Sequence, residues 1–467
     1  MARPITLGEL RESGWRSVAV KEEMRRNAVA RLEAGTALFD GVLGYEDTVM
    51  PQLANAILAG HDVVFLGERG QAKTRMIRSL TALLDEWMPI VAGSEINDDP
   101  YQPVSRFARD LVADRADATP IDWVHRDDRY GEKLATPDTS IADLIGEVDP
   151  IKVAEGRYLG DELTIHYGLV PRTNRGIFAI NELPDLAERI QVGLLNVLEE
   201  RDVQIRGYRV RLPLDVVVVA SANPEDYTNR GRMITPLKDR FGSQIRTHYP
   251  RDAAVETIIA RTEARESSIA GVRVLWPEFM EEIVATISQV ARSSSLVNQR
   301  SGVSVRLTVS NRELLGANAV RRALRLGERE VSPRIGDLAA LAPAMAGKIE
   351  IEAMEEGRDG AIVQSLVSAA VLQVFRRNMT SERLGEVVAA FDDGLVVHGG
   401  DDVTVDRYSE MIAMVPGLAR LVEGIVGATA PPSVAASAAE FIFEGLHLGK
   451  RLNKDVAGAA ATYRSRA

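Results

Sequence analysis

The sequence predicts an α/β fold in which a parallel sheet is followed by an all-helical region. Four apolar runs have the length and composition of short buried strands: 63–66, the start of 177–200, 216–220 and 243–249. Helical patterns separate these runs, as they do where helices join parallel strands. After Pro250 the pattern changes to helix throughout. We therefore expect a sheet domain over 41–250 and helical segments after it.

Length and composition are those of a globular protein with several domains. The chain has 467 residues, of which 45% are hydrophobic and 26% charged, enough for roughly two to four domains. It holds no cysteine, which excludes disulfides, thiolate metal sites and a cysteine nucleophile. Its net charge of −11 argues against broad nucleic-acid binding. We expect a cytoplasmic protein, because we find neither a transmembrane run nor the apolar core of an export signal.

The first strand leads into a glycine-bearing turn and then a helix with an apolar face over 75–84. Backbone N–H groups of such a turn and of the helix N-terminus point at anionic oxygens. A lysine adds charge for the β and γ phosphates, and the next hydroxyl can bind Mg²⁺. The plainer alternative is a turn in some other α/β protein. The predicted phosphate loop, GERGQAKT, consists of Gly67, Glu68, Arg69, Gly70, Gln71, Ala72, Lys73 and Thr74.

One position of this loop departs from the usual pattern, which has glycine immediately before the lysine. Here that residue is Ala72. Its methyl group would obstruct close approach of a phosphate, or cost about 1–2 kcal/mol if the backbone needs a positive φ.

Helical segments precede the loop. Residues 1–40 have the composition of a helical lead-in, and 42–60 predict a second helix that ends at Gly60. A segment in this place often lies beside an adenine base, with Val42 and Gly44 as candidates. Plain helix packing explains these two residues equally well.

The less regular parts of the sheet domain contain two further predictions. Residues 89–175 have the pattern of a large insertion with a few short elements, in which Ser140 caps a short helix. Residues 203–212 predict a β-hairpin, because apolar residues alternate on both sides of a turn. The hairpin region holds Arg201, Arg206, Arg209 and Arg211.

Polar residues follow the ends of three predicted strands. Lys73 comes after the first strand, Glu182 after the second and Asn223 after the third. Ligands of parallel sheets bind at the carboxyl ends of the strands. The sequence therefore predicts that one site collects all three side chains, and this convergence is stronger evidence than any single motif.

The region after Pro250 contains several helix candidates. Ser310 and Glu313 have the spacing of a capping box for the third of them. The candidates are 252–265, 277–292, 312–326, 333–347 and 358–377.

Four motifs in this order, GERGQAKT, IFAINE, ASANPEDY and LKDRFG, resemble those of the AAA+ ATPases. The segments GIFAINELPDL, LLNVLEERDVQIRGYRVRLP and TPLKDRFGSQI are similar to the branch that holds the MoxR proteins and the magnesium-chelatase I subunit. The resemblance covers roughly residues 40–350. It implies a P-loop domain over 41–250, a helical lid over 251–350 and a helical C-terminal extension over 351–467. It also implies that 203–212 is a hairpin insertion and that a helix insertion lies within 137–170.

The resemblance implies roles for the residues at the strand ends. The glycines, Lys73 and Thr74 of the loop would bind the triphosphate of ATP. Glu182 would orient and polarise the attacking water, and Asn223 would sense the water or the γ phosphate. The plainer interpretations are a glutamate that caps the next helix and an Asn-Pro turn.

Three arginines receive roles from the same resemblance. Arg240 would reach into the neighbouring subunit as an arginine finger, unless it is an ordinary ion-paired surface residue. Arg306 would act as the second sensor from the lid. Arg312 is the rival for that role, and Arg306 stands slightly ahead.

A second departure concerns the metal. Asn181 stands where the family usually has an aspartate that helps to hold Mg²⁺, and a neutral amide attracts a divalent cation less. Thr74 and Asn181 remain the candidate metal-site residues. With Lys73 and Glu182 present, the sequence favours an active ATPase whose hydrolysis Asn181 and Ala72 would slow.

The function implied is an ATP-driven ring motor, hexameric in the family, that remodels or matures a client protein or drives metal insertion. Its partner would bear a von Willebrand A domain and be supplied in trans, because we find no Asp-x-Ser-x-Ser triplet in the sequence. The alternative is a nucleotide-gated assembly scaffold with little turnover, which the departures at Ala72 and Asn181 favour. A sigma-54-dependent activator ranks third, because we find no GAFTGA-like loop.

Overall fold

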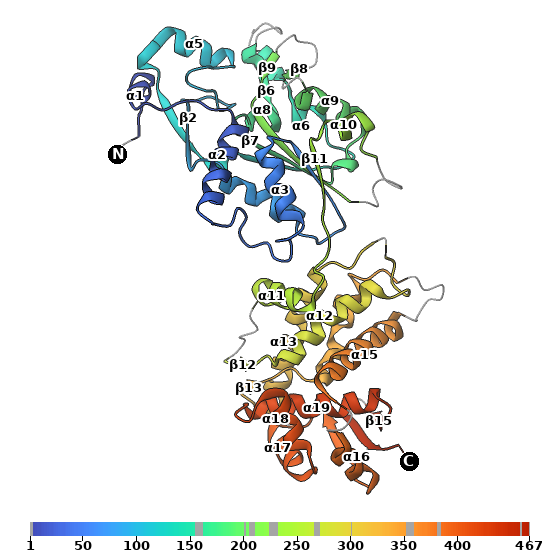
Figure 1. Cartoon of the computed structure of the whole chain (residues 1–467). Helices are drawn as coiled ribbons and strands as arrows, with labels where there is room; N and C mark the ends of the chain where they lie inside the picture. The colour runs from blue at the N-terminus through green and yellow to red at the C-terminus, as the bar shows by residue number, and fades with distance from the viewer. Residues whose placement is uncertain are drawn as a thin grey trace. The chain divides into compact units, whose positions relative to one another are not determined.

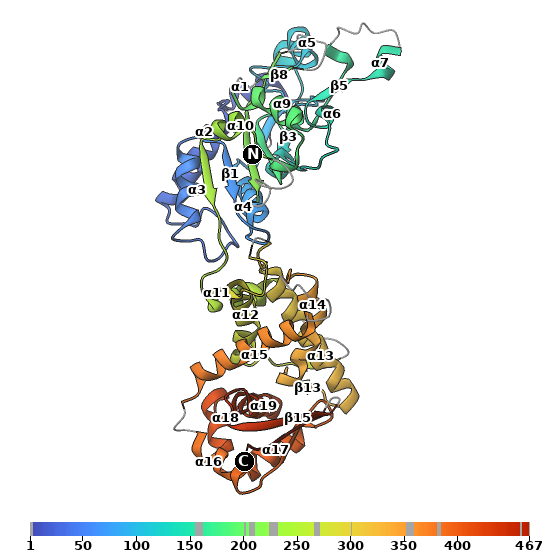
Figure 2. The same cartoon turned by 90° about the vertical axis from the view of Figure 1, so that its right-hand side faces the viewer.

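A computed structural model divides the chain into two compact units, Met1–His248 and Tyr249–Ala467. Figures 1 and 2 show both units. The structure describes residues 3–154, 162–199, 202–204, 211–223, 232–265, 271–299, 301–351, 359–380, 384–457 and 460–466.

The first unit is built on a five-stranded parallel sheet. Its strands, in spatial order, are β11 Ser243–Arg246, β1 Val63–Leu66, β10 Val216–Ala222, β7 Gly176–Asn181 and β4 Tyr130–Leu134. The four strands predicted from apolar runs are all present. The fold class predicted from the sequence is therefore confirmed for this unit.

Side chains of the central strands alternate between two hydrophobic clusters, one on each face of the sheet. Val63 and Phe65 belong to one cluster, and Val64 belongs to the other. Because both faces are covered, these strands are apolar at nearly every position. The first cluster includes residues of α2 Val20–Glu33, α3 Val49–Leu58, α4 Lys73–Ser79 and the 3₁₀ turn Leu80–Leu83, and the second includes residues of α9 Glu188–Glu199 and α10 Thr235–Arg240.

The predicted helix over 42–60 is shorter in the structure, because α3 begins at Val49. Residues 42–48 are turns and irregular chain. Gly44 has a φ of 83°, a left-handed conformation that no helix residue adopts.

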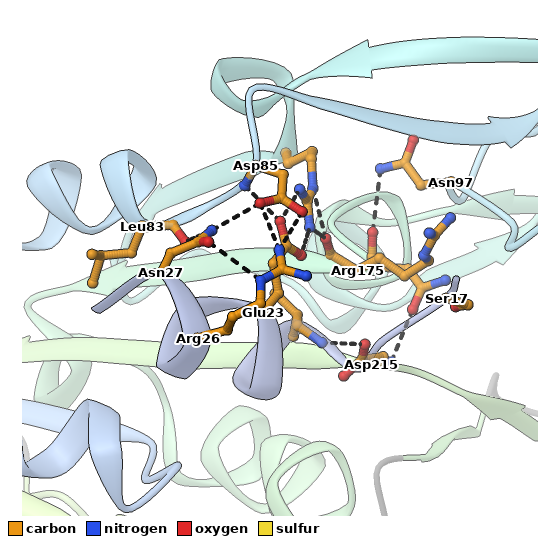
Figure 3. Close-up of polar contacts among 12 residues, drawn as sticks. Ser17, Glu23, Arg26, Asn27, Leu83, Asp85, Asn97, Arg175 and Asp215 are labelled. Atoms are coloured by element: carbon orange, nitrogen blue, oxygen red, sulfur yellow. Dashed lines mark hydrogen bonds and ion pairs between the residues drawn. The ribbon is translucent and has the colours of Figure 1, made fainter. Parts of the chain in front are cut away.

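The lead-in helices α1 Leu7–Glu12 and α2 pack within the sheet unit. Glu23 of α2 accepts two hydrogen bonds from the buried guanidinium of Arg129, at 2.7 and 2.6 Å. It also accepts the backbone N–H of Asp85 at 2.7 Å, as Figure 3 shows. At the start of α2 the backbone N–H of Val20 donates to Asp215 at 2.7 Å. Residues 1–40 therefore help to hold the sheet domain together.

The segment 89–175 contains a core strand that sequence analysis missed. Strand β4 has the sequence YGEKL and pairs with β7 at the edge of the sheet. It lacks an apolar run because its side chains are only partly buried, and Leu134 is exposed. The described residues of this segment also form the strand pairs β2 Trp87–Val91 with β3 Ile121–His125 and β5 Gly146–Val148 with β6 Ile165–Tyr167, and the α-helices α5 Arg106–Arg115, α6 Ile141–Leu144, α7 Pro150–Ala154 and α8 Leu169–Arg172.

Two local predictions in the sheet unit are confirmed. Ser140 caps α6 in a capping box with Asp143. The hairpin consists of β8 Asp202–Gln204 and β9 Arg211–Pro213, with Val203 opposite Leu212. Three of its predicted arginines, Arg201, Arg206 and Arg209, lie outside the described residues.

The second unit is mainly helical. Helix α13 begins earlier than predicted, so the expected capping box of Ser310 and Glu313 is wrong: both residues lie inside the helix. The buried Thr308 in the first turn bonds Ser288 at 2.7 Å, so packing against α12 extends the helix. The main helices are α11 Ala253–Glu263, α12 Glu278–Ser293, α13 Arg306–Leu326, α15 Asp359–Asn378, α16 Gly385–Asp392, α17 Val405–Met414, α18 Leu418–Val426 and α19 Pro432–Leu448.

The predicted lid and the predicted C-terminal extension share one hydrophobic core. Phe279 of α12 stacks on Phe441 of α19, with ring centroids 4.5 Å apart. The extension also contains an antiparallel sheet that the sequence did not predict, in the order β14 Val397–Gly400, β16 Ala460–Ser465 and β15 Leu452–Ala457. Figure 2 shows α18 and β15 beside α19.

Among the described residues, no helix is both long and apolar enough to cross a membrane.

Candidate nucleotide site

The predicted phosphate loop joins the end of β1 to the start of α4. A side chain at Gly67 would collide with Thr247 Oγ1 and Gln71 Oε1, at 1.8 and 2.2 Å from an added Cβ. Gly70 and Ala72 both have left-handed backbones, with φ of 75° and 54°. The loop therefore needs its two glycines, and at Ala72 an L-residue occupies a conformation that favours glycine.

Lys73 begins α4 and is buried. Its ammonium group donates to the carbonyl oxygens of Gly67 and Glu68, the latter at 2.8 Å. It also donates to Asn223 Oδ1 at 2.8 Å. The cation is thus held at the mouth of the loop, where it can neutralise phosphate charge.

Glu182 and Asn223 meet at the ends of β7 and β10, as the sequence predicted. Asn223 Nδ2 donates to Glu182 Oε2 at 2.5 Å. Because the other end of the same amide accepts from Lys73, one asparagine connects the cation to the carboxylate. Glu182 has a left-handed φ of 55°, a strained conformation of the kind found at functional sites. A carboxylate held in this way can orient and polarise a water molecule.

Thr74, the second residue of α4, lies close to Asn181, the last residue of β7. Thr74 Oγ1 is 3.4 Å from Asn181 Oδ1. The buried Ser221 donates to the same oxygen at 3.2 Å and accepts the backbone N–H of Glu182 at 3.2 Å. Sequence analysis gave Ser221 no role, although it stands just before a strand end that it singled out.

The amide nitrogen of Asn181 donates to Glu132 Oε1 of β4 at 2.6 Å. Glu132 in turn accepts from Arg78 at 2.8 and 3.1 Å and from the Tyr130 hydroxyl at 2.9 Å. Burial alone would raise the pKa of Glu132, but the hydrogen bonds from Arg78, Tyr130 and Asn181 bring it below its usual value. Sequence analysis missed Glu132 because it missed β4.

Tyr45 connects the loop to the end of β11. Its hydroxyl lies 2.8 Å from the carbonyl oxygen of Gln71 and 2.7 Å from that of His248. Burial raises the pKa of Tyr45 to about 12, so the hydroxyl stays protonated as a donor. Neighbouring Val42 is buried in the hydrophobic cluster on this face of the sheet, as the interpretation of Val42 as a packing residue expects. The adenine-side role of Val42 and Gly44 remains a prediction.

Of the three arginines, Arg240 belongs to the sheet unit and the other two to the second unit. Arg240 ends α10 and donates to the Pro236 carbonyl at 2.9 Å. Arg306 is exposed at the first position of α13. Arg312 is mostly buried, 3.4 Å from Glu281 and over the Trp276 ring at 4.5 Å. Their roles at the nucleotide remain predictions.

The residues present fit a magnesium-bound phosphate. Mg²⁺ is usually held by one or two protein oxygens together with waters and phosphate oxygens. The Thr74 hydroxyl and Asn181 Oδ1 are such oxygens at the mouth of a loop with Lys73. Within the described parts of the chain, we find no cluster of three His, Cys, Asp or Glu residues that would hold a metal by itself.

Part of the chain matches the model of a known family. Residues 152–241 match the model of the sigma-54 interaction domain. The matched segment includes β7 and β10 but begins after the phosphate loop.

The chain is also similar to two magnesium-chelatase proteins. It is 29% identical to the magnesium-chelatase 38 kDa subunit of Rhodobacter capsulatus over 276 residues, 55% of this chain and 69% of that protein. It is 26% identical to the magnesium-chelatase subunit ChlI of Mesostigma viride over 306 residues, 62% of this chain and 77% of that protein. The remainder of the chain lies outside these matches.

Solved structures give a weaker likeness. A model of the complex between subunits BchI and BchD of magnesium chelatase has 18% identity and a TM-score of 0.32, covering 78% of this chain and 100% of that chain. The NtrX structure from Brucella abortus with ADP has 16% identity and a TM-score of 0.38, covering 78% of this chain and 70% of that chain.

Proposed function

Since this chain is an AAA+ ATPase of the magnesium-chelatase-like branch, we propose that it hydrolyses ATP at the loop 67–74 and uses the energy as a ring-forming motor. Its nucleotide is ATP with Mg²⁺. The observation that carries the proposal is the chain of contacts from Lys73 through Asn223 to Glu182. Lys73 begins the helix that follows β1, and Asn223 and Glu182 follow β10 and β7, which supports a single site for the triphosphate.

Each residue of this group has a task in phosphoryl transfer. Lys73 and the backbone N–H groups of the loop hold the triphosphate. Thr74 would hold Mg²⁺ through its hydroxyl group, and the bound ion would neutralise charge on the phosphate oxygens. Glu182 positions the attacking water and accepts its proton. Asn223 keeps the Glu182 carboxylate oriented and links it to the lysine.

Phosphate release with Mg-ATP tests the proposal. We expect Lys73→Ala to lose ATP binding and turnover together. We expect Glu182→Gln to keep ATP binding and to lose about 100-fold or more in turnover, the scale of general-base catalysis. The matched control is Glu188→Gln, because Glu188 is exposed at the start of α9; this variant should keep full turnover.

Either of two results would overturn the assignment. If Glu182→Gln and Glu188→Gln behave alike, Glu182 is not the residue that positions water. If the unmodified protein binds no nucleotide, residues 67–74 are not a working phosphate site.

The second candidate is a nucleotide-gated scaffold. Ala72 and Asn181 favour it, because both depart from the usual hydrolytic pattern. It predicts ATP-dependent assembly with negligible phosphate release by the unmodified protein. Size-exclusion chromatography with ATP, run beside the turnover assay, distinguishes the two candidates.

We further propose the setting in which the motor works. The curated relatives are named as subunits, which supports a motor that acts with a partner. We propose a hexameric ring in the cytoplasm, a von Willebrand A-domain partner in trans, and either chaperone-like maturation of a client or metal insertion as the task. Arg240 would then act in the neighbouring subunit's site.

A further inference from the structure

The amide of Asn181 has a fixed orientation, and Glu132 fixes it. An asparagine side chain can present either its oxygen or its nitrogen in a given direction, and its partners decide which. Glu132 is ionised and accepts hydrogen bonds without donating any, so the side facing it must be Nδ2, at 2.6 Å. The oxygen of Asn181 is therefore turned toward Thr74, at 3.4 Å, and Ser221, at 3.2 Å.

Glu132 itself is held rigidly. One of its oxygens accepts from Asn181 and Arg78, and the other accepts from Arg78 and Tyr130. Arg78 and Thr74 lie on the same helix, α4, one turn apart. The carboxylate thus ties the edge strand β4 to the helix that begins with the phosphate-binding lysine.

The arrangement also explains why residue 181 is an asparagine. An aspartate there would place a second carboxylate against Glu132 at the distance of a hydrogen bond. Like charges so close raise the cost of keeping both ionised. The amide of Asn181 instead donates a hydrogen bond to Glu132 and turns its oxygen away from Glu132. The charged acceptor polarises the amide, so this oxygen carries more negative charge.

We propose that Glu132 is a positioning residue for the divalent cation of this site. It turns the oxygen of Asn181 toward the metal position beside Thr74 and supplies there the negative charge that a neutral residue 181 lacks. The inference rests on the proposed function, because it concerns the Mg²⁺ of the same nucleotide site.

A double-mutant cycle tests the proposal through metal dependence. The full-length protein is titrated with MgCl₂ at a fixed concentration of a fluorescent ATP analogue, and the Mg²⁺ concentration that gives half-maximal binding is measured. Glu132→Gln should raise this concentration about tenfold or more. The variant loses the hydrogen bond to a charged group, and the Asn181 amide is then free to exchange the positions of its oxygen and nitrogen. Glu147→Gln is the control: Glu147 is exposed on β5, and the change should have no effect.

The second arm of the cycle starts from Asn181→Asp. In that background Glu132→Gln should lower the Mg²⁺ requirement, because it removes the repulsion between carboxylates and gives the new carboxylate at position 181 a donor. The same substitution thus acts in opposite directions in the two backgrounds. General damage to the fold would weaken Mg²⁺ binding in both and would overturn the proposal, as would no effect in either.

Nucleotide binding in EDTA separates this inference from the proposed function. We expect the unmodified protein and Glu132→Gln to bind the analogue equally in EDTA, because Glu132 acts on the metal. Equal binding in EDTA with an unchanged Mg²⁺ requirement refutes the role of Glu132 and leaves the ATPase proposal standing. If the unmodified protein binds no analogue under any condition, both fall.

Discussion

Replacing Ala72 by glycine should stabilise the protein. Ala72 has φ 54° and ψ 16°, a left-handed conformation that costs an L-residue about 1–2 kcal/mol. Glycine adopts it freely but loses more chain entropy on folding, about 0.4–1 kcal/mol. The residue is exposed, so little apolar burial is lost with the methyl group. The free energy of unfolding should therefore rise by about 0.5–1 kcal/mol in Ala72→Gly.

The matched control is the same chemical change in an ordinary helical conformation. Ala30 is exposed within α2, and Ala30→Gly should lower the free energy of unfolding by about 1 kcal/mol. Urea unfolding followed by tryptophan fluorescence suits both variants, because Trp15, Trp87 and Trp123 lie in the sheet unit. The two substitutions should shift the midpoint in opposite directions.

A downward shift of similar size in both variants would refute the reasoning, because it would mean that the side chain of residue 72 has no conformational cost.

The Ala72→Gly variant also bears on nucleotide binding. If the Ala72 methyl group obstructs the phosphate, Ala72→Gly should bind ATP more tightly as well. If stability rises and ATP affinity stays unchanged, the Ala72 methyl group strains the backbone but does not obstruct the phosphate.

Two further predictions concern other parts of the chain. Glu23→Ala should lower the free energy of unfolding by about 3–5 kcal/mol, because it leaves the buried Arg129 without its carboxylate partner. The control is Glu22→Ala, which breaks an exposed ion pair. It should lower the free energy of unfolding by at most about 1 kcal/mol in the same urea experiment. Arg306→Ala should reduce ATP turnover without changing the melting temperature. Arg312→Ala should lower the melting temperature, because it removes packing inside the second unit. If instead Arg312→Ala reduces turnover at an unchanged melting temperature and Arg306→Ala does not, Arg312 is the second sensor.

Three strands of the sheet were predictable because they are buried on both faces. Strands β1, β7 and β10 lie inside the sheet, and each is apolar at most positions. Strand β4 is at the edge and reads YGEKL, a sequence with no run that distinguishes it from a loop. Its pairing with β7 is a long-range contact that local pattern does not encode.

The same limit applies to the site. Lys73, Glu182 and Asn223 were predictable because each follows an apolar run, and strand ends of a parallel sheet converge. Glu132 and Ser221 contact Asn181 from within strands, so only the register of the sheet brings them there. The start of α13 was missed for a related reason, since burial of Thr308 against α12 outweighed the local capping signal at Ser310.

The departure at Asn181 changes its meaning once Glu132 is considered. Taken from the sequence alone, a neutral residue at this position favours weak metal binding and a scaffold without turnover. In the structure the carboxylate of Glu132 on β4 accepts a hydrogen bond from this amide, so a negative charge lies beside the neutral residue 181. Arg78 and Tyr130 hold this carboxylate against the amide, so a neutral residue 181 does not by itself imply weak metal binding. The Asn181–Glu132 pair therefore removes weak metal binding as an argument against the motor, and phosphate release by the unmodified protein decides between motor and scaffold.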